Sequence, residues 1–316
     1  MDESTHSPPV IDATPLLADP ESPASQACAT RIHEACLEWG FFVLVGHGLE
    51  PQLDQLLASA RSFFAQPQHV KEQTPRSGGY GFVPLSSLAI DTSRSSDATE
   101  YLDLGLTDEA PLPALPDFEQ VVRGYQRAAL DIAAAILRAV ALGSGADPGF
   151  FAERMADPQC KLRFLHYPAV DPDEDGVLPV PTAAHTDYGA LTLLATDGVA
   201  GLEVRPLDRP WVPVVAPRGS LVVNLGDMLA RWTNDRYQST PHRVVGPTSG
   251  DRVSIPFFVN PDPDTVVTPI SACVDDQHPA AYGPITAGAF LRQRREGSDE
   301  PYVDPGAGPD RRPTAG

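Results

Sequence analysis

The 316-residue sequence has only four cysteines, and no two of them form a Cys-x-x-Cys pair. So few cysteines do not make a disulfide framework or a zinc knuckle, and they fit a reducing compartment. The first residues are acidic and lack the apolar core of a signal peptide. No apolar run is long enough to span a bilayer. We therefore expect a cytoplasmic protein without a membrane partner.

Basic residues are also scarce, because 23 lysines and arginines are outnumbered by 42 aspartates and glutamates, which gives a net charge of −19. A surface of this sign repels phosphate backbones, so we expect no nucleic-acid partner. A cationic substrate would suit the charge, but general acidity more often serves solubility. Hydrophobic residues make up 42% of the chain, which is enough apolar surface for the core of a globular protein.

Two segments have the periodicity of buried helices. Ser22 and Pro23 provide an N-cap and a first-turn proline ahead of apolar residues at helical spacing. A longer helix is expected from Asp117, which resembles a capping box together with Gln120, to a stop at Gly143. The apolar stripe of this second helix predicts a face packed on the core rather than a cofactor site.

From about Lys161 onward, short apolar or alternating segments are separated by turn residues. A series of short strands at this spacing is typical of a β-sandwich or barrel. The expected strands cover residues 162–167, 191–195, 202–204, 211–215, 221–225, 243–245 and 253–259. Residues 1–9 are expected to be loose, and residues 296–316, rich in glycine, proline and charge, to form a disordered tail.

Three side chains have the chemistry and spacing of a metal site. Residues two apart in an extended segment point to the same side, so His185 and Asp187 present an imidazole and a carboxylate together. His242 lies just before another strand-like run and supplies a third ligand. Two histidines and one carboxylate on one side of a metal leave positions open, as in the iron(II) oxygenases. A His-x-Asp match alone has a high false-positive rate, so the assignment depends on the rest of the pattern.

Arg252 and Ser254 add independent support. Alternation places them on the same side of a predicted strand. A guanidinium fork with a neighbouring hydroxyl suits a carboxylate. Because the strand is otherwise apolar, its charge is expected to face a cavity or a partner.

Together these motifs resemble the iron(II)/2-oxoglutarate-dependent dioxygenases of the isopenicillin N synthase-like family. The matching segments are Trp39-Gly40-Phe41-Phe42, Gly46-His47-Gly48, residues 100–105, His185-Thr186-Asp187-Tyr188-Gly189, Gly226-Asp227-Met228-Leu229 with Thr233-Asn234, residues 239–244, and Arg252-x-Ser254. The resemblance extends from about Val10 to Phe290. It departs from the plant pattern at His166-Tyr167-Pro168, where plant members usually have Tyr-Tyr-Pro-Pro, and this suggests a bacterial-type member.

The resemblance implies a mainly β fold with flanking helices, whose core is a distorted double-stranded β-helix, or jelly roll. It implies an N-terminal non-haem dioxygenase region of mixed α/β structure at residues 10–115, a helical connection at 116–155, the jelly-roll core at 156–262 and a C-terminal extension over the core at 263–295. It also implies iron(II) held by His185, Asp187 and His242, and 2-oxoglutarate held through its distal carboxylate by Arg252 and Ser254. Tyr167 matches a tyrosine that approaches this cosubstrate, although a packed strand aromatic is an equal alternative.

The implied reaction is the oxidation by dioxygen of an unactivated C–H bond of a small molecule, most often a hydroxylation, with release of succinate and CO2. An iron oxidase that makes the same metal site without 2-oxoglutarate, for desaturation or ring closure, stays open, as does a catalytically silent jelly-roll binding protein. An amino acid or a secondary metabolite, for example in antibiotic biosynthesis, would suit as substrate. Residues 77–96 read as a loop near the pocket. The candidate substrate contacts are Tyr80, Phe82, Arg163 and Tyr188.

Overall fold

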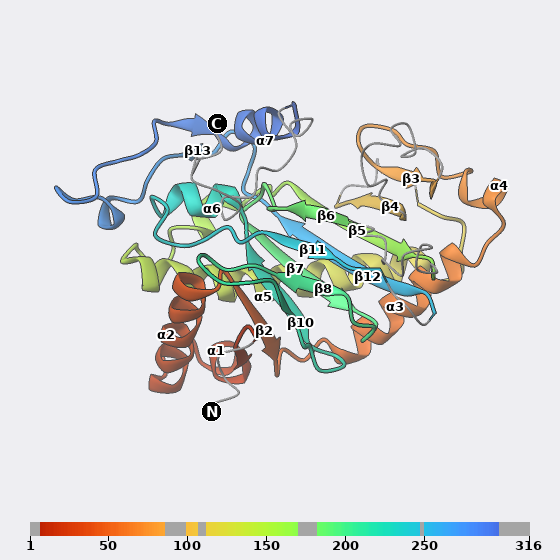
Figure 1. Ribbon diagram of the computed structural model, residues 1–316, viewed down its shortest axis with the longest axis horizontal. Coiled ribbons are helices and arrows are strands. Elements are labelled where there is room, and N and C mark those ends of the chain that lie inside the picture. The colour runs from red at the N-terminus through yellow and green to blue at the C-terminus, as the bar shows by residue number, and fades with distance from the viewer. Residues whose placement is uncertain (1–6, 86–98, 107–111, 170–181, 247–249, 297–316) are drawn as a thin grey trace.

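The computed structural model describes residues 7–85, 99–106, 112–169, 182–246 and 250–296, and two β-sheets form its centre (Figure 1). The larger sheet has the order β1 (Val10–Asp12), β2 (Phe41–Val45), β10 (Leu221–Leu225), β7 (Leu191–Thr196), β12 (Arg252–Val259), β5 (Cys160–Tyr167), β4 (Glu100–Gly105) and β3 (Gly81–Val83). The smaller sheet has the order β6 (Thr182–His185), β11 (His242–Val244), β8 (Leu202–Val204) and β9 (Val212–Pro213). A separate pair consists of β13 (Val266–Val267) and β14 (Ile285–Thr286).

Helices cover one side of the larger sheet, and α5 crosses behind it (Figure 1). On this side α2 (Pro23–Glu38) and α3 (Glu50–Phe64) pack against α5 (Phe118–Ser144). The other helices of the described residues are α1 (Thr14–Ala18), α4 (Gln68–Lys71), α6 (Asp227–Trp232) and α7 (Ala287–Glu296), with 3-10 turns at Ala152–Arg154 and Ser271–Cys273, and α6 and α7 lie beside β13 and β14. In the part of the chain that the structure describes, no helix has the length and hydropathy needed to cross a bilayer.

Strand β12 shows how alternation divides the larger sheet into two faces. Val253, Ile255 and Phe257 belong to the main hydrophobic core, and the Phe257 ring lies 6.2 Å from that of Tyr125 in α5. Arg252 and the other alternate positions therefore point to the opposite face, away from the helices. The charge in this apolar strand is thus kept out of the helical core, as the sequence predicted.

The strands expected from the sequence are present, although β9 is limited to Val212–Pro213. The predicted N-cap is also present, since the Ser22 hydroxyl accepts a hydrogen bond from the Ser25 amide. Within the predicted loop at 77–96, residues 81–83 form edge strand β3, and residues 86–96 lie outside the described residues. The predicted tail, apart from residue 296, and most of the predicted loose N-terminus lie outside them as well.

The long helix begins after Asp117, as predicted, but the predicted capping box and the predicted stop at Gly143 are wrong. Asp117 has a φ of 56° and no side-chain capping hydrogen bond, so it does not form the expected capping box with Gln120. The helix continues past Gly143 to Ser144, and Gly145 ends it with a φ of 79°. A Cβ at Gly143 would lie only 2.7 Å from the Tyr237 hydroxyl. Gly143 is therefore needed for close packing of the helix rather than for its end.

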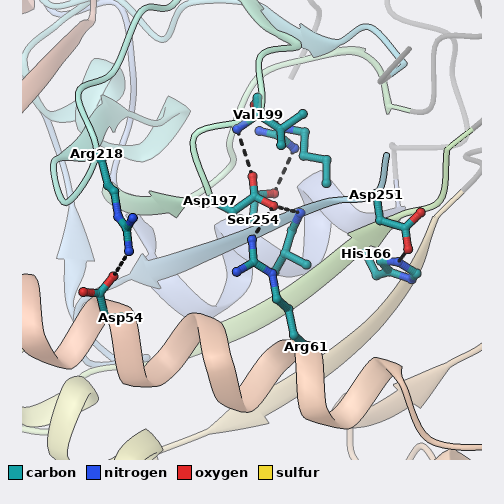
Figure 2. A network of polar contacts seen from close by, with 10 residues as sticks. Asp54, Arg61, His166, Asp197, Val199, Arg218, Asp251 and Ser254 are labelled. Atoms are coloured by element: carbon teal, nitrogen blue, oxygen red, sulfur yellow. Dashed lines mark hydrogen bonds and ion pairs between the residues drawn. The ribbon is translucent and has the colours of Figure 1, made fainter. Parts of the chain in front are cut away.

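On the helix-covered face, His166 connects three elements. Its Nδ1 lies 2.9 Å from Glu100 in β4, and its Nε2 lies 3.0 Å from Asp251 before β12 (Figure 2). Glu100 also accepts a hydrogen bond of 2.6 Å from Lys71 of α4, and the imidazole stacks on Phe64. Because carboxylates accept hydrogen bonds, both ring nitrogens carry protons here. Burial lowers the pKa of His166, but the bonds to Glu100 and Asp251 outweigh burial and raise it overall.

This network predicts a pH-dependent contribution to stability. A raised folded-state pKa means that His166 stabilises the fold fully below the unfolded pKa of about 6.5, and that the contribution is lost as the pH rises through the folded value. Urea unfolding of the wild type and His166→Gln over a pH series is expected to give free energies of unfolding that converge as the pH rises. His69→Gln, at an exposed position, is the control. A difference between wild type and His166→Gln that does not change with pH contradicts the prediction.

Candidate functional site

Pairing between strands β6 and β11 brings the three predicted metal ligands together. His185 and His242 are directly paired across these antiparallel strands, and Asp187 follows β6. One ligand atom from each residue lies within 4.8 Å of the other two, and the Asp187 Oδ1 is 3.8 Å from His242 Nε2. Asp187 and His242 are buried, and His185 is half-buried. Alternation along one strand is enough to place His185 beside Asp187. The pairing of β6 with β11 brings the predicted third ligand, His242, next to them.

Backbone carbonyls orient both imidazoles. The Nδ1 of His185 lies 2.8 Å from the Ala183 carbonyl oxygen, and the Nδ1 of His242 lies 3.2 Å from that of Thr240. Because a carbonyl only accepts, each Nδ1 carries the proton and each Nε2 keeps its lone pair for a metal. Burial, together with the neighbouring His185, lowers the pKa of His242 to about 4, which keeps that ring neutral.

The carboxylate of Asp187 is held by two residues that the sequence reasoning missed. Its Oδ2 accepts hydrogen bonds of 2.6 Å from the Thr192 hydroxyl of β7 and the Asn224 amide of β10. Burial raises the pKa of Asp187, but electrostatic interaction with His242 and His185 and these two bonds outweigh burial and lower it overall. Oδ1 is left for a metal. Asn224 could have been noticed, because it is the one polar residue in the apolar strand β10.

A glycine fixes the loop that carries Asp187. A Cβ at Gly226 would lie 2.2 Å from the Gly189 carbonyl oxygen and 2.7 Å from that of Asp187. The next residue, Asp227, donates its backbone amide to the Asp187 carbonyl at 2.8 Å and accepts a bond from Thr186 at 3.3 Å. Gly226 and Asp227 thus hold the backbone of residues 187–189 in place, and only glycine at position 226 lets the two chain segments approach this closely.

Arg252 is a buried cation on the same sheet face. Its side chain is 1% exposed, and it donates to the Ser254 hydroxyl at 3.2 Å and to the Val199 carbonyl at 3.3 Å. Its guanidinium lies 4.8 Å from the ring of Tyr167, with which it is paired across β12 and β5. Among the described residues, no carboxylate lies within ion-pair distance of Arg252. A buried charge without a counter-charge is costly, so this arrangement favours a bound anion.

The buried carboxylate of Asp197 organises the backbone around Arg252 (Figure 2). Its Oδ2 accepts a bond of 2.8 Å from the Val253 amide and one of 3.2 Å from Arg61 of α3, and its Oδ1 accepts one of 3.1 Å from the Val199 amide. Val253 directly follows Arg252, and the Val199 carbonyl accepts from Arg252. Asp197 therefore fixes two groups that set the position of the guanidinium.

The four predicted substrate contacts are not all brought together. Tyr188 directly follows the metal ligand Asp187, and its ring lies 5.0 Å from the Arg294 guanidinium of α7. Arg163 of β5 is paired with Asp103 of β4. Their neighbours in both strands belong to the core, so these two side chains point to the opposite face of the sheet. Tyr80 lies beside the next basic residue of β5, with the Lys161 Nζ 5.5 Å from its ring.

Phe82 lies on the other face of the larger sheet. It is paired with the core residue Leu102, and its ring contacts that of Phe63 in α3 at 5.6 Å. The structure therefore does not bring Phe82 to the face of the metal residues. An aromatic residue in a glycine-rich segment suggested a pocket contact, but strand parity decides which face it occupies.

Two family models match the chain. The 2OG-Fe(II) oxygenase superfamily matches residues 157–261, and the model for the N-terminal region of non-haem dioxygenases in morphine synthesis matches residues 8–122. A 2-oxoglutarate-dependent dioxygenase, citB, of Monascus ruber is 35% identical over 286 residues, which cover 83% of this chain and 87% of that protein. A homoarginine-6-hydroxylase of Glycine max is 35% identical over 290 residues, covering 83% and 88%.

Solved structures agree with these relatives. The structure of a full-length Neurospora crassa protein in complex with alpha-KG and thymine has a TM-score of 0.83 at 26% identity and covers 94% of this chain and 99% of its own. A putative 2OG-Fe(II) oxygenase family protein of Caulobacter crescentus has a TM-score of 0.82 at 29% identity, with coverage of 92% and 99%. They confirm the predicted double-stranded β-helix core. The chain therefore belongs to the 2OG-Fe(II) oxygenase superfamily, and it is an oxidoreductase that uses iron(II), 2-oxoglutarate and dioxygen.

Proposed function

We propose that His185, Asp187 and His242 hold the iron and that Arg252 and Ser254 hold the distal carboxylate of 2-oxoglutarate. What carries this proposal is the location of both groups on one sheet face. Thr192 of β7 donates to Asp187, while Thr196, on the same side of β7, is paired with Ser254. A metal site and a buried cation with no carboxylate partner among the described residues thus face the same space.

The protein's own residues position the reactants. An iron(II) ion held by these residues, together with 2-oxoglutarate, would supply the oxidation of a substrate C–H bond by dioxygen, coupled to the decarboxylation of 2-oxoglutarate to succinate and CO2. The carbonyls behind His185 and His242 fix the two imidazoles, and Asp187 contributes the negative charge that balances the metal. Arg252 neutralises the far carboxylate of the cosubstrate in a buried site, with Tyr167 beside it.

The primary substrate in this proposal is a small molecule that undergoes hydroxylation. Arg163, Tyr80 and Tyr188 are its proposed contacts, and Phe82 is not included because of its place on the other face. The homoarginine hydroxylase of Glycine max and the thymine complex of the Neurospora crassa protein support an amino acid or a small metabolite. The net charge of −19 argues against nucleic acid. We also propose a cytoplasmic location, supported by cysteine thiols that are all buried and free.

A screen for succinate release tests the proposed function. Purified protein with iron(II) and 2-oxoglutarate is incubated with a panel of amino acids and small metabolites. At least one compound is expected to stimulate succinate formation, with one succinate per oxidised product. Absence of 2-oxoglutarate decarboxylation by the iron-loaded protein under all conditions overturns the proposal.

The role of Asp197 gives a prediction for the cosubstrate alone. Asp197→Asn keeps the shape of the side chain but replaces one acceptor oxygen with a donor group, so the amide of Val253 or Val199 loses its partner. We expect the half-saturating 2-oxoglutarate concentration to rise about tenfold, since a net hydrogen bond is worth roughly 1 kcal/mol or more. Iron binding is expected to be unchanged. Asp54→Asn, in the exposed pair with Arg218, is the control, and an unchanged 2-oxoglutarate requirement in Asp197→Asn contradicts the prediction.

A further inference from the structure

A cluster of charged residues shares the sheet face of the metal site. Thr192, which donates to Asp187, is paired with Phe258 of β12, and Phe258 is paired with Lys161 of β5. Paired residues of antiparallel strands point to the same side, so Lys161 faces the same space as the metal ligands. Two strand spacings separate Thr192 from Lys161, which is about 10 Å. A small molecule can span this distance.

The carboxylate at the centre of the cluster is buried and already accepts three hydrogen bonds. Asp103 is 1% exposed, and it accepts two parallel bonds from Arg163, from Nε at 2.6 Å and from Nη2 at 2.8 Å. Lys161 donates a third bond to Asp103 at 3.2 Å and another to the Gly79 carbonyl at 3.1 Å. The guanidinium also lies 4.2 Å from the ring of Tyr101, which limits its orientation.

The cluster therefore keeps donors and positive charge in excess. Two cations share one carboxylate, and the bonds described leave the Nη1 group of Arg163 and one N–H of Lys161 unused. The side chains of Arg163 and Lys161 remain 28% and 25% exposed, so these groups are open to a ligand. Burial lowers the pKa of Lys161, and the positive charges of Arg163 and Arg295 lower it further, while Asp103 raises it. Arg295 of α7 therefore adds to the positive potential at Lys161.

We propose that Lys161 and Arg163 bind a carboxylate of the primary substrate and hold it about 10 Å from Thr192, the residue beside the metal ligand Asp187. This inference rests on the proposed function and specifies its substrate class, a monoanionic small molecule. Asp103 is too buried to accept from a cationic ligand, whereas the unused donors match a carboxylate. In a chain with a net charge of −19, a local excess of positive charge attracts an anion to this face.

Lys161→Gln is the variant that isolates the excess charge, because the pair of Arg163 with the buried Asp103 is left intact. The probes are small aliphatic, aromatic and amino acids, each with its primary amide. Their binding is followed by ligand-observed NMR on anaerobic protein loaded with iron(II) and saturating 2-oxoglutarate, so that Arg252 is already occupied. At least one acid is expected to bind more tightly than its amide, and Lys161→Gln to weaken that acid by roughly ten- to a hundredfold.

Two comparisons complete the test. Lys161→Arg is expected to retain most of the preference for the acid. Arg218→Gln removes one positive charge from an 86% exposed side chain that is paired with Asp54 (Figure 2), and it is expected to leave the preference unchanged. If no acid binds better than its amide, or if Lys161→Gln leaves the preference unaltered, the cluster is a structural ion pair and the proposal is wrong. Decarboxylation of 2-oxoglutarate by the same wild-type protein separates this failure from a failure of the proposed function.

Discussion

Replacing Asp187 with alanine is expected to remove iron binding and oxygenase activity together. Asp187 is the one anionic member of the group, and its Oδ1 is the carboxylate oxygen left for the metal. Loss of residues that only support a metal ligand typically costs ten- to a hundredfold in affinity, so loss of the ligand itself is expected to cost more than about a hundredfold. Wild-type protein is expected to bind about one iron(II) per chain. His185→Ala and His242→Ala are expected to behave like Asp187→Ala.

The supporting bond from Thr192 provides a graded comparison. Thr192→Val keeps the size of the side chain but removes the donor to Asp187, so about tenfold weaker iron binding is expected. Asp275→Ala, at an exposed acidic position, is the matched control. Iron titration under anaerobic conditions and circular dichroism of each variant separate metal loss from unfolding. Undiminished iron binding by folded Asp187→Ala protein, or wild-type activity that survives rigorous chelation, contradicts the assignment.

Local patterns predicted most of the strands but not how they pair. Alternation predicted that His185 and Asp187 share a side, since this depends only on two adjacent positions. The pairing of His185 with His242 joins residues far apart in the chain, and no local pattern contains it. The order of the motifs, through the family resemblance, supplied what periodicity could not. The domain boundaries predicted from that resemblance stay a prediction, as do the roles of the individual ligands.

The errors arose where tertiary contacts decide a residue's role. Gly143 looked like a helix stop, but its missing side chain makes room for Tyr237. Phe82 was predicted to contact the substrate, but its pairing with Leu102 directs its side chain into the hydrophobic core. Asp197 escaped notice because its partners include two backbone amides, which sequence alone does not show. Asn224 stands out as a polar residue in an apolar strand, but its partner Asp187 is distant in the sequence. Helix α3 was not predicted, although Leu53, Leu56, Ala60 and Phe63 recur at helical spacing after a first-turn proline.

Replacing Arg252 tests whether this residue holds the distal carboxylate of 2-oxoglutarate. The distal carboxylate of the cosubstrate must be neutralised when it is buried, and Arg252 is 1% exposed with no carboxylate partner among the described residues. Arg252→Ala is expected to lose roughly 2–5 kcal/mol of binding to the cosubstrate, a rise in its half-saturating concentration of roughly thirty- to several-thousandfold. Arg252→Lys keeps the charge without the planar fork, so a smaller rise is expected.

The kinetic design varies 2-oxoglutarate at fixed primary substrate, and then the reverse. If Arg252 binds the cosubstrate, Arg252→Ala raises the half-saturating concentration of 2-oxoglutarate but not that of the primary substrate, and one succinate forms per product. Arg243→Ala provides a matched strand arginine whose charge is already paired with Glu203 at 2.7 Å, and it is expected to change neither series. If Arg252→Ala weakens only the primary substrate and leaves the 2-oxoglutarate series unchanged, the buried cation holds the substrate's own carboxylate and the assignment of Arg252 to the cosubstrate is wrong.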